Sequence, residues 1–129
     1  MCTVIKNKVK DGKIGYKVVR IFKSKNIVRS AVYDEYMWRK GNNLVWSKKD
    51  FKKIIVSINP RSQYNGYFHA FANIKYARRV QCNMSDGIFK YAIIKVVMSK
   101  DCHSANMGLD KNIPGFCSKK AYWDGEFIS

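Results

Sequence analysis

The stretch Gly66–Arg79, GYFHAFANIKYARR, joins a short aromatic segment to a basic segment in one continuous run. The aromatic residues over 67–71, YFHAF, predict a short β-strand. Asn73 is a good helix N-cap, and the Ala-containing residues after it predict a helix over 73–82. We therefore expect this stretch to supply both core, through its rings, and positive charge, through one lysine and two arginines.

Candidate strands lie on both sides of this stretch, in segments rich in β-branched and aromatic residues. They are 16–22, 27–33, 44–46, 53–58, 88–98 and 121–128. The segment 88–98 is apolar on both faces and is expected at the centre of the sheet. Residues 1–15 are read as a basic lead-in and 99–114 as a long irregular connection. The chain is predicted to be a single α+β domain, 1–129, with a mainly antiparallel sheet of about five to six strands and one principal helix.

The charge of the chain is strongly positive and unevenly placed along the sequence. The formal net charge is +16. Residues 1–85 carry nineteen Lys and Arg against four acids, whereas residues 86–129 carry six against five. This pattern favours a basic face, opposite a nearly neutral one, that binds an acidic partner such as nucleic acid. A Lys-rich surface that only keeps the protein soluble explains the same composition.

The four cysteines are expected to be free thiols in a reducing cytoplasm. Residues 1–13 are polar and lack the apolar core of a secretory signal, and no apolar run is long enough to cross a membrane. Cys102 and His103 are adjacent and do not have the spacing of a zinc knuckle, so no metal site is predicted. No cofactor motif is present, and no catalytic residue is assigned.

Two histidines and Arg20 are the remaining candidates for chemistry. His69 or His103 could meet a cysteine thiol in the fold, but His69 in its aromatic strand is typical of a hydrogen-bonded core histidine. In the predicted strand 16–22, Arg20 lies on the same face as Tyr16 and Val18, so it has apolar neighbours. It either extends to water at a sheet edge or binds an anion in a cleft.

Arg20, Ser30 and Glu126 loosely resemble the Arg/Ser/Glu arrangement of ADP-ribosyltransferases. The resemblance implies that the arginine holds the pyrophosphate of NAD and that the glutamate orients the ribose. The Ser-Thr-Ser motif of that family is missing, and the chain is short for its fold.

A second resemblance covers most of the chain through scattered aromatic residues and glycines. The segments are Tyr16-Lys-Val-Val-Arg20, Tyr36 to Gly41, Gly66-Tyr-Phe-His-Ala-Phe71 with Ala77-Arg78, Gly108, and Trp123-x-Gly-Glu-Phe127. Together they resemble small uncharacterised proteins of phages and mobile elements. That resemblance implies a compact sheet domain in the cytoplasm of a host cell. Small basic proteins of this origin are often inhibitors of host defence, such as anti-CRISPR proteins.

The function predicted from these features is non-enzymatic binding of nucleic acid, a nucleoprotein defence complex or another acidic partner. Aromatic residues interleave with cations, and this combination suits stacking on bases and neutralising phosphates. The residues expected to bind are Arg20, Trp38, Arg39, Lys40, Lys75, Arg78 and Arg79. The alternatives are an ADP-ribosyltransferase-like enzyme and a sponge that traps an anionic nucleotide near Arg20 and Arg78.

Overall fold

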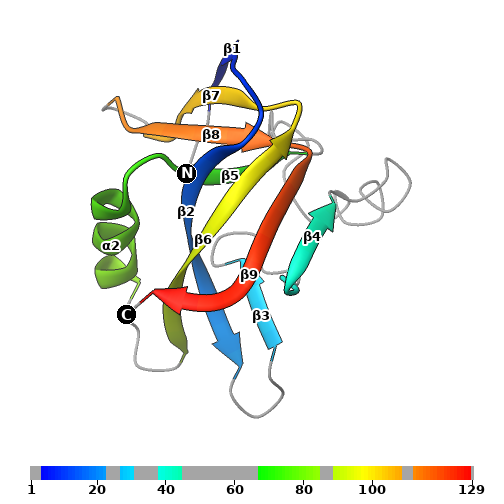
Figure 1. The fold of residues 1–129 in the computed structure, drawn as a ribbon. Coiled ribbons are helices and arrows are strands. Elements are labelled where there is room, and N and C mark those ends of the chain that lie inside the picture. The colour runs from blue at the N-terminus through cyan, green and yellow to red at the C-terminus, as the bar shows by residue number, and fades with distance from the viewer. Residues whose placement is uncertain are drawn as a thin grey trace, which may run out of the picture.

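The computed structural model of the protein describes residues 4–22, 27–30, 38–44, 67–84, 89–108 and 112–128. Nine strands in these segments form one sheet (Figure 1). The strands are β1 (Val4–Lys8), β2 (Lys13–Phe22), β3 (Ile27–Ser30), β4 (Gly41–Leu44), β5 (Phe68–Phe71), β6 (Lys90–Lys100), β7 (His103–Asn106), β8 (Pro114–Ser118) and β9 (Lys120–Ile128). Their order is β1-β7-β8-β5-β2-β6-β9-β4, and β3 pairs with β2 beside this path. Each of these pairings is antiparallel.

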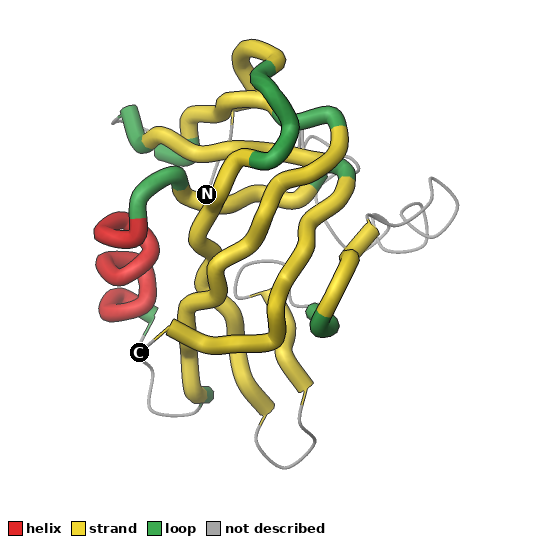
Figure 2. The backbone as a smooth tube through the Cα atoms, in the orientation of Figure 1, coloured by secondary structure: helices red, strands yellow, loops and turns green. Residues whose placement is uncertain are grey.

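The sheet turns sharply at β2, because this long strand changes its neighbour along its length. Tyr16, near its start, pairs with Phe71 of β5, whereas its last four residues pair with β3. On its other side β2 pairs continuously with β6. As a result, β5, β7 and β8 run across the long strands β2, β6 and β9 (Figures 1 and 2).

Glycine makes the close approach at this turn possible. A Cβ atom at Gly15 would lie 2.5 Å from the Cβ of Ala70 on β5, which is far inside van der Waals contact. A Cβ at Gly115 of β8 would likewise overlap the side chain of Met107. The close packing of β2 on β5, and of β8 on β5 and Met107, therefore requires positions without side chains.

The two faces of β2 and β6 belong to two different cores. Val19 and Ile94 lie in the core enclosed by the curved sheet, together with Trp38, Phe68 and Trp123. The alternate residues of the same strands, including Val18 and Ile93, form a second core under the helix with Phe71, Ala77 and Met107. The alternation predicted for residues 16–22 is thus confirmed, and β6 lies inside the sheet between β2 and β9, as predicted for 88–98.

The helix α2 (Ile74–Asn83) packs on the outside of the sheet, against β2, β5 and β6 (Figure 2). The side chain of Asn73 accepts a hydrogen bond from the backbone N–H of Lys75 at 3.0 Å, the capping role expected of it. Ala77 lies on the side of the helix that faces the sheet and is fully buried, and Gln81 Nε2 donates to the carbonyl of Tyr91 at 2.9 Å. Each end of α2 lies within one residue of the predicted helix, 73–82.

The predicted α+β fold with five to six strands is wrong, since the sheet has nine strands and dominates the described residues. The missed strands are β1, inside the supposed lead-in, and β7 and β8, in or at the end of the supposed connection 99–114. Their sequences, VIKNK, HSAN and PGFCS, lack apolar alternation and include polar residues, proline and glycine. These segments are strands because β7 pairs with both β1 and β8. This pairing forms only in the folded chain and cannot be predicted from the local sequence pattern. The predicted strand 53–58 lies outside the described residues.

Candidate functional site

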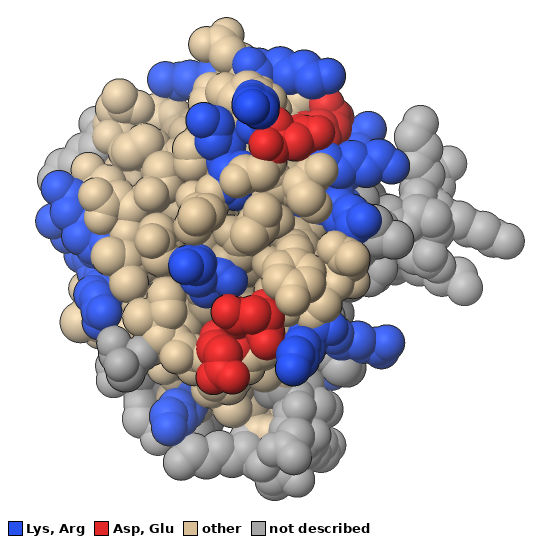
Figure 3. Space-filling model, in the orientation of Figure 1, with Lys and Arg blue, Asp and Glu red and all other residues tan. Residues whose placement is uncertain are grey.

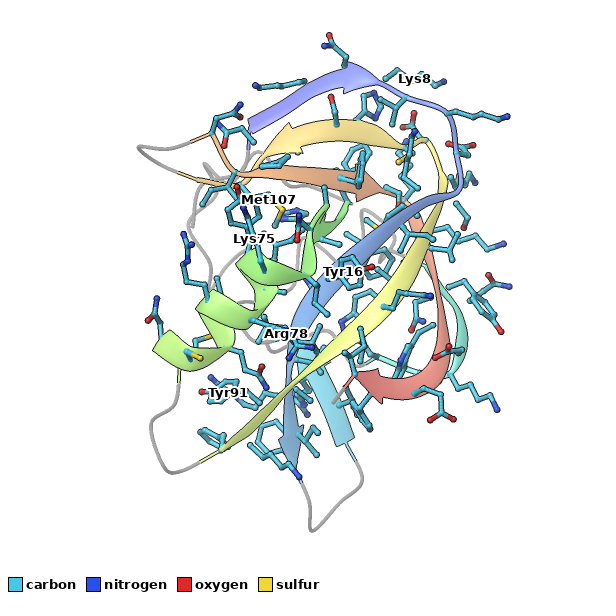
Figure 4. All side chains as sticks on the ribbon, turned by 60° about the vertical axis from the view of Figure 1, so that its left-hand side comes forward. Lys8, Tyr16, Lys75, Arg78, Tyr91 and Met107 are labelled. Carbon is cyan, nitrogen blue, oxygen red and sulfur yellow. The ribbon has the colours of Figure 1, made fainter. Side chains whose placement is uncertain are left out.

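The solvent side of α2 carries three cations, which we call the α2 face: Lys75, Arg78 and Arg79. All three are exposed, and their spacing of three and four residues places them on one side of the helix. Lys75 Nζ and Arg79 Cζ lie 5.1 and 5.8 Å from the ring centroid of Tyr76. No acidic residue occurs in α2. Figure 4 shows Lys75 and Arg78 on the helix, and Figure 3 shows cations along this edge of the molecule.

Arg20 lies in a row of cations and rings that crosses β3, β2 and β6. It pairs with Arg29 of β3 on one side and with Tyr91 of β6 on the other. Its Nη2 donates to the hydroxyl of Tyr91 at 3.4 Å, and its Cζ lies 4.5 Å from the ring centroid of Phe89. The aromatic faces stabilise a half-buried guanidinium, so Arg20 has a structural role here.

Trp38 does not belong to a binding surface, contrary to the prediction. Its side chain is buried with 3% exposure, and its ring centroid lies 4.9 Å from that of Phe68. Its Nε1 donates to Ser30 Oγ at 2.8 Å. The indole, followed in sequence by two cations, fills the core because its large apolar area outweighs the polarity of those neighbours.

Arg39 and Lys40 are exposed, but they lie apart from the α2 face. The carbon chain of Lys40 approaches Gly125 of β9, where an added Cβ would be 3.0 Å from Lys40 Cδ. β4 and α2 lie on opposite sides of the view in Figure 1. The predicted binding residues therefore form two separate groups of cations, with Arg20 packed among rings.

The ADP-ribosyltransferase-like set is not brought together. Arg20 pairs with Arg29, while Ser30 pairs with Val19, so Arg20 and Ser30 project on opposite faces of the sheet. Glu126 lies exposed on β9, where its backbone N–H donates to Asp124 Oδ1 at 2.8 Å. No shared cleft for a dinucleotide follows from these positions.

A second polar site, which we call the Asp101 cluster, was missed in the sequence. Asp101 lies between β6 and β7 with φ of 52°. Its carboxylate accepts a hydrogen bond from the Tyr67 hydroxyl at 2.6 Å and lies 3.6 Å from Lys119 Nζ, 3.9 Å from Lys8 Nζ and 3.9 Å from His103 Nδ1. The hydrogen bond from Tyr67, followed by the nearby cations, lowers the pKa of Asp101. The same hydrogen bond is the main reason that the pKa of Tyr67 rises to about 12.

The Asp101 cluster joins residues that are far apart in the sequence, so no motif marks it. Its five members come from β1, the residue before β5, the β6–β7 turn, β7 and the residue between β8 and β9. The single carboxylate offsets one of the two positive charges of Lys8 and Lys119. The cluster therefore ties strands together and offers a partner less positive charge than its lysines alone would.

A buried amine, imidazole and thiol lie next to this region. Lys17 Nζ donates to the backbone carbonyl of His69 at 2.9 Å. Burial lowers the pKa of Lys17 to about 8, and burial together with the positive charge of Lys17 lowers the pKa of His69 to about 3. His69 and His103 both pair with Cys117, across β5, β8 and β7. Burial raises the pKa of Cys117 to about 12, so its thiol is protonated at neutral pH and lacks the activation that a nucleophilic cysteine needs.

Figure 3 shows one face of the molecule, on which cations lie along much of the edge and near the centre and the acidic side chains gather in two groups. The predicted contrast between a basic face and a nearly neutral opposite face stays a prediction. The C-terminal third of the chain contributes Lys95, Lys100, Lys119 and Lys120 to the described residues, and the middle part contributes the α2 face. The groups that surround each cation therefore determine whether it can bind an anion.

Among the described residues, no group of three or more His, Cys, Asp or Glu is placed to hold a metal ion. In the same segments, no helix has the length and apolar character needed to cross a bilayer. Comparisons of the chain with protein-family models, curated proteins and solved structures find no match. The resemblance to phage and mobile-element proteins stays a prediction, and function has to be argued from this chain's own residues.

Proposed function

We propose that the protein is a non-enzymatic binding domain that holds nucleic acid, alone or in a nucleoprotein complex, through the α2 face. The observation that carries this proposal is the exposure of three neighbouring cations on a helix that contains no acid. The opposite side of that helix is seated on the second core through Ala77, so the cations are held on a rigid element. A rigid, cationic ridge suits the phosphate backbone of a polyanion.

Two other places on the described surface combine cations with carboxylates. Lys8 and Lys119 share the carboxylate of Asp101. Lys40 lies over Gly125, between Asp124 and Glu126 in the sequence of β9. A phosphate approaching either place would meet a negative charge as well as a positive one. The α2 face is therefore the strongest candidate for attracting an anion.

Binding through lysine and arginine alone is driven by counterion release and reads little sequence. If each cation of the α2 face neutralises one phosphate of duplex DNA, the logarithm of the affinity falls with the logarithm of salt with a slope of about −2.7. Affinity also rises with the length of the polymer. A sponge for a small anionic nucleotide would instead show one saturable site that is indifferent to polymer length.

Fluorescence anisotropy with labelled duplexes of increasing length, between about 50 and about 200 mM salt, tests the proposal. The variant Arg78→Glu/Arg79→Glu should lose most of the affinity, while its melting temperature stays that of the parent. The matched control is Arg39→Glu/Lys40→Glu, an equal change of charge at the second exposed pair, which should lose much less. Equal losses for both variants, or a salt-independent affinity, would refute binding through the α2 face.

The biological setting of this binding is a separate part of the proposal. Inhibition of a host defence system in the cytoplasm follows only from the resemblance described above. A pull-down from host lysate, with and without nuclease, tests it. Recovery of a defence protein that survives nuclease treatment supports a nucleoprotein target, whereas recovery of nucleic acid alone supports simple binding.

A further inference from the structure

We infer that the sheet surface beside α2 binds the bases of a single-stranded nucleic acid whose phosphates lie along the α2 face. This inference rests on the proposed function and deepens it, because it selects single strands over duplexes. It depends on four residues that form one line across β2, β6, β9 and β4, which we call the outer row: Ile14, Val97, Tyr122 and Asn42.

The register of the sheet defines the outer row. Ile14 pairs with Val97, Val97 pairs with Tyr122, and Tyr122 pairs with Asn42. Residues paired across antiparallel strands project on the same side of the sheet. Ile14 is 46% exposed and Tyr122 is 42% exposed, values unusual for large apolar side chains in the middle of a sheet. The row is thus a strip of apolar and aromatic surface open to solvent.

The outer row continues into the α2 face through Tyr16. Tyr16 lies two residues after Ile14 on the same side of β2 and packs against the second core, which also includes Tyr76 of α2. Figure 4 shows Tyr16 on the strand next to the helix that carries Lys75 and Arg78. A strand of nucleic acid could therefore pass from the helix to the row without crossing an acidic side chain of the described residues.

Positive charge accompanies the outer row, and this selects a polyanion over a neutral apolar partner. Lys95 pairs with Tyr16 and is exposed, and it lies two residues from Val97 on the same side of β6. On β9, Lys120 and Asp124 each lie two residues from Tyr122, and Lys120 is half-buried whereas Asp124 is exposed. The carboxylate of Asp124 repels a phosphate backbone, which is therefore directed from Tyr122 toward β2 and α2. Figure 3 shows a face that is mostly uncharged, with one group of cations near its centre, a group of acidic side chains just below it and further cations along its edges.

An open sheet surface with an exposed ring fits single strands better than duplexes. Unpaired bases expose their faces and stack on aromatic side chains, whereas paired bases in a duplex cover those faces by stacking on each other. Stacking on one ring changes the affinity for single strands by about tenfold or more and depends little on the identity of the base. Duplex binding needs only phosphate contacts, which the α2 face supplies.

The test compares an oligothymidylate, the matching oligouridylate and a duplex of the same length, using fluorescence anisotropy. Tyr122→Ala should weaken binding to both single strands by about tenfold and leave the duplex unchanged. Tyr122→Phe, which keeps the ring, should bind all three probes like the parent. Lys95→Glu is a second variant at an exposed position, for use if Tyr122→Ala does not fold, and should also weaken single strands more than the duplex.

The outcomes separate this inference from the proposed function. Unchanged single-strand affinity in Tyr122→Ala, or an equal loss on the duplex, overturns the role of the outer row and leaves the α2 face standing. Failure of the parent protein to bind any of the probes overturns both. Concentration-dependent dimers of the parent that Tyr122→Ala abolishes, seen by sedimentation, would show that a second copy covers the row and would also overturn the inference.

Discussion

The α2 face and the Asp101 cluster contain the same kinds of cationic side chain in opposite surroundings. On α2, the lysine and arginine side chains are exposed, and the helix itself contains no acid. In the Asp101 cluster, Lys8, Lys119 and His103 converge on one carboxylate that also accepts a 2.6 Å hydrogen bond from Tyr67. The comparison teaches that a cation's role depends on its nearest carboxylate. Changes in the cluster should affect stability, and changes on α2 should affect binding.

The largest expected effect on stability is that of removing the carboxylate at the centre of the cluster. Asp101→Ala should lower the free energy of unfolding by about 2 kcal/mol, through loss of the charged acceptor and the strain of an alanine at positive φ. Asp101→Asn should cost about 1 kcal/mol, because asparagine tolerates this backbone conformation and still accepts from Tyr67. Urea denaturation measures both, and Arg79→Ala serves as the control on α2, with a change within about 0.5 kcal/mol. An Arg79→Ala loss as large as that of Asp101→Ala would break the comparison.

Acid should weaken the protein without changing the charge of the α2 cations. The pKa of His69 is about 3 in the fold and about 6.5 when unfolded, so the unfolded chain takes up a proton first and stability falls as pH drops from about 6.5 to about 3. The lowered pKa of Asp101 adds a further loss once pH falls below the ordinary range of an aspartate. Melting temperatures from pH 7 to pH 3 check this. Asp101→Asn should keep the first loss and lack the second, and a melting temperature independent of pH would contradict both assignments.

Lys17 sharpens the comparison, since its ammonium group is desolvated and donates to the backbone carbonyl of His69 rather than to a carboxylate. With a pKa of about 8 in the fold and about 10.4 unfolded, it makes the parent more stable as pH rises from about 8 to about 10. Lys17→Met should therefore be more stable than the parent at pH 7, and that advantage should shrink across this range. Denaturation at pH 7, 8.5 and 10 follows the difference. A constant difference would mean that Lys17 is not desolvated.

The smallest expected effects are those of neutralising single lysines. Lys75→Ala should make the salt slope of duplex binding shallower by about 0.9, equivalent to one phosphate contact. Lys8→Ala, the same substitution in the Asp101 cluster, should leave the slope unchanged, because Lys8 already lies beside a carboxylate. Equal changes in the two variants would show that proximity to Asp101 does not neutralise Lys8.

The parts of the fold that could be predicted are those whose signals are local. The alternation of residues 16–22, the apolar character of 88–98 and the cap at Asn73 each depend on neighbours in the sequence, and each matches the structure. The strands β1 and β7 depend on pairing with each other across about a hundred residues, which no local pattern reports.

The candidate site shows the same division. The exposure of Lys75, Arg78 and Arg79 follows from helical spacing around a buried Ala77, so it could be read from the sequence. The burial of Trp38 and the gathering of cations around Asp101 depend on strands that meet only in the folded chain. The outer row likewise required the register of four strands before Ile14 and Tyr122 could be placed in one line.

The position of β2 at the turn of the sheet also governs the order of assembly. Its hairpin with β3 joins residues close in sequence and can form early. Its pairing with β6 joins Lys13 to Met98 and Ile21 to Lys90, so most of its length has no partner until the later part of the chain is available. Loop closure over such separations slows folding. During synthesis, β2 therefore leaves the ribosome as an unpaired edge rich in β-branched residues, and the abundant positive charge of the nascent chain helps to keep such edges apart.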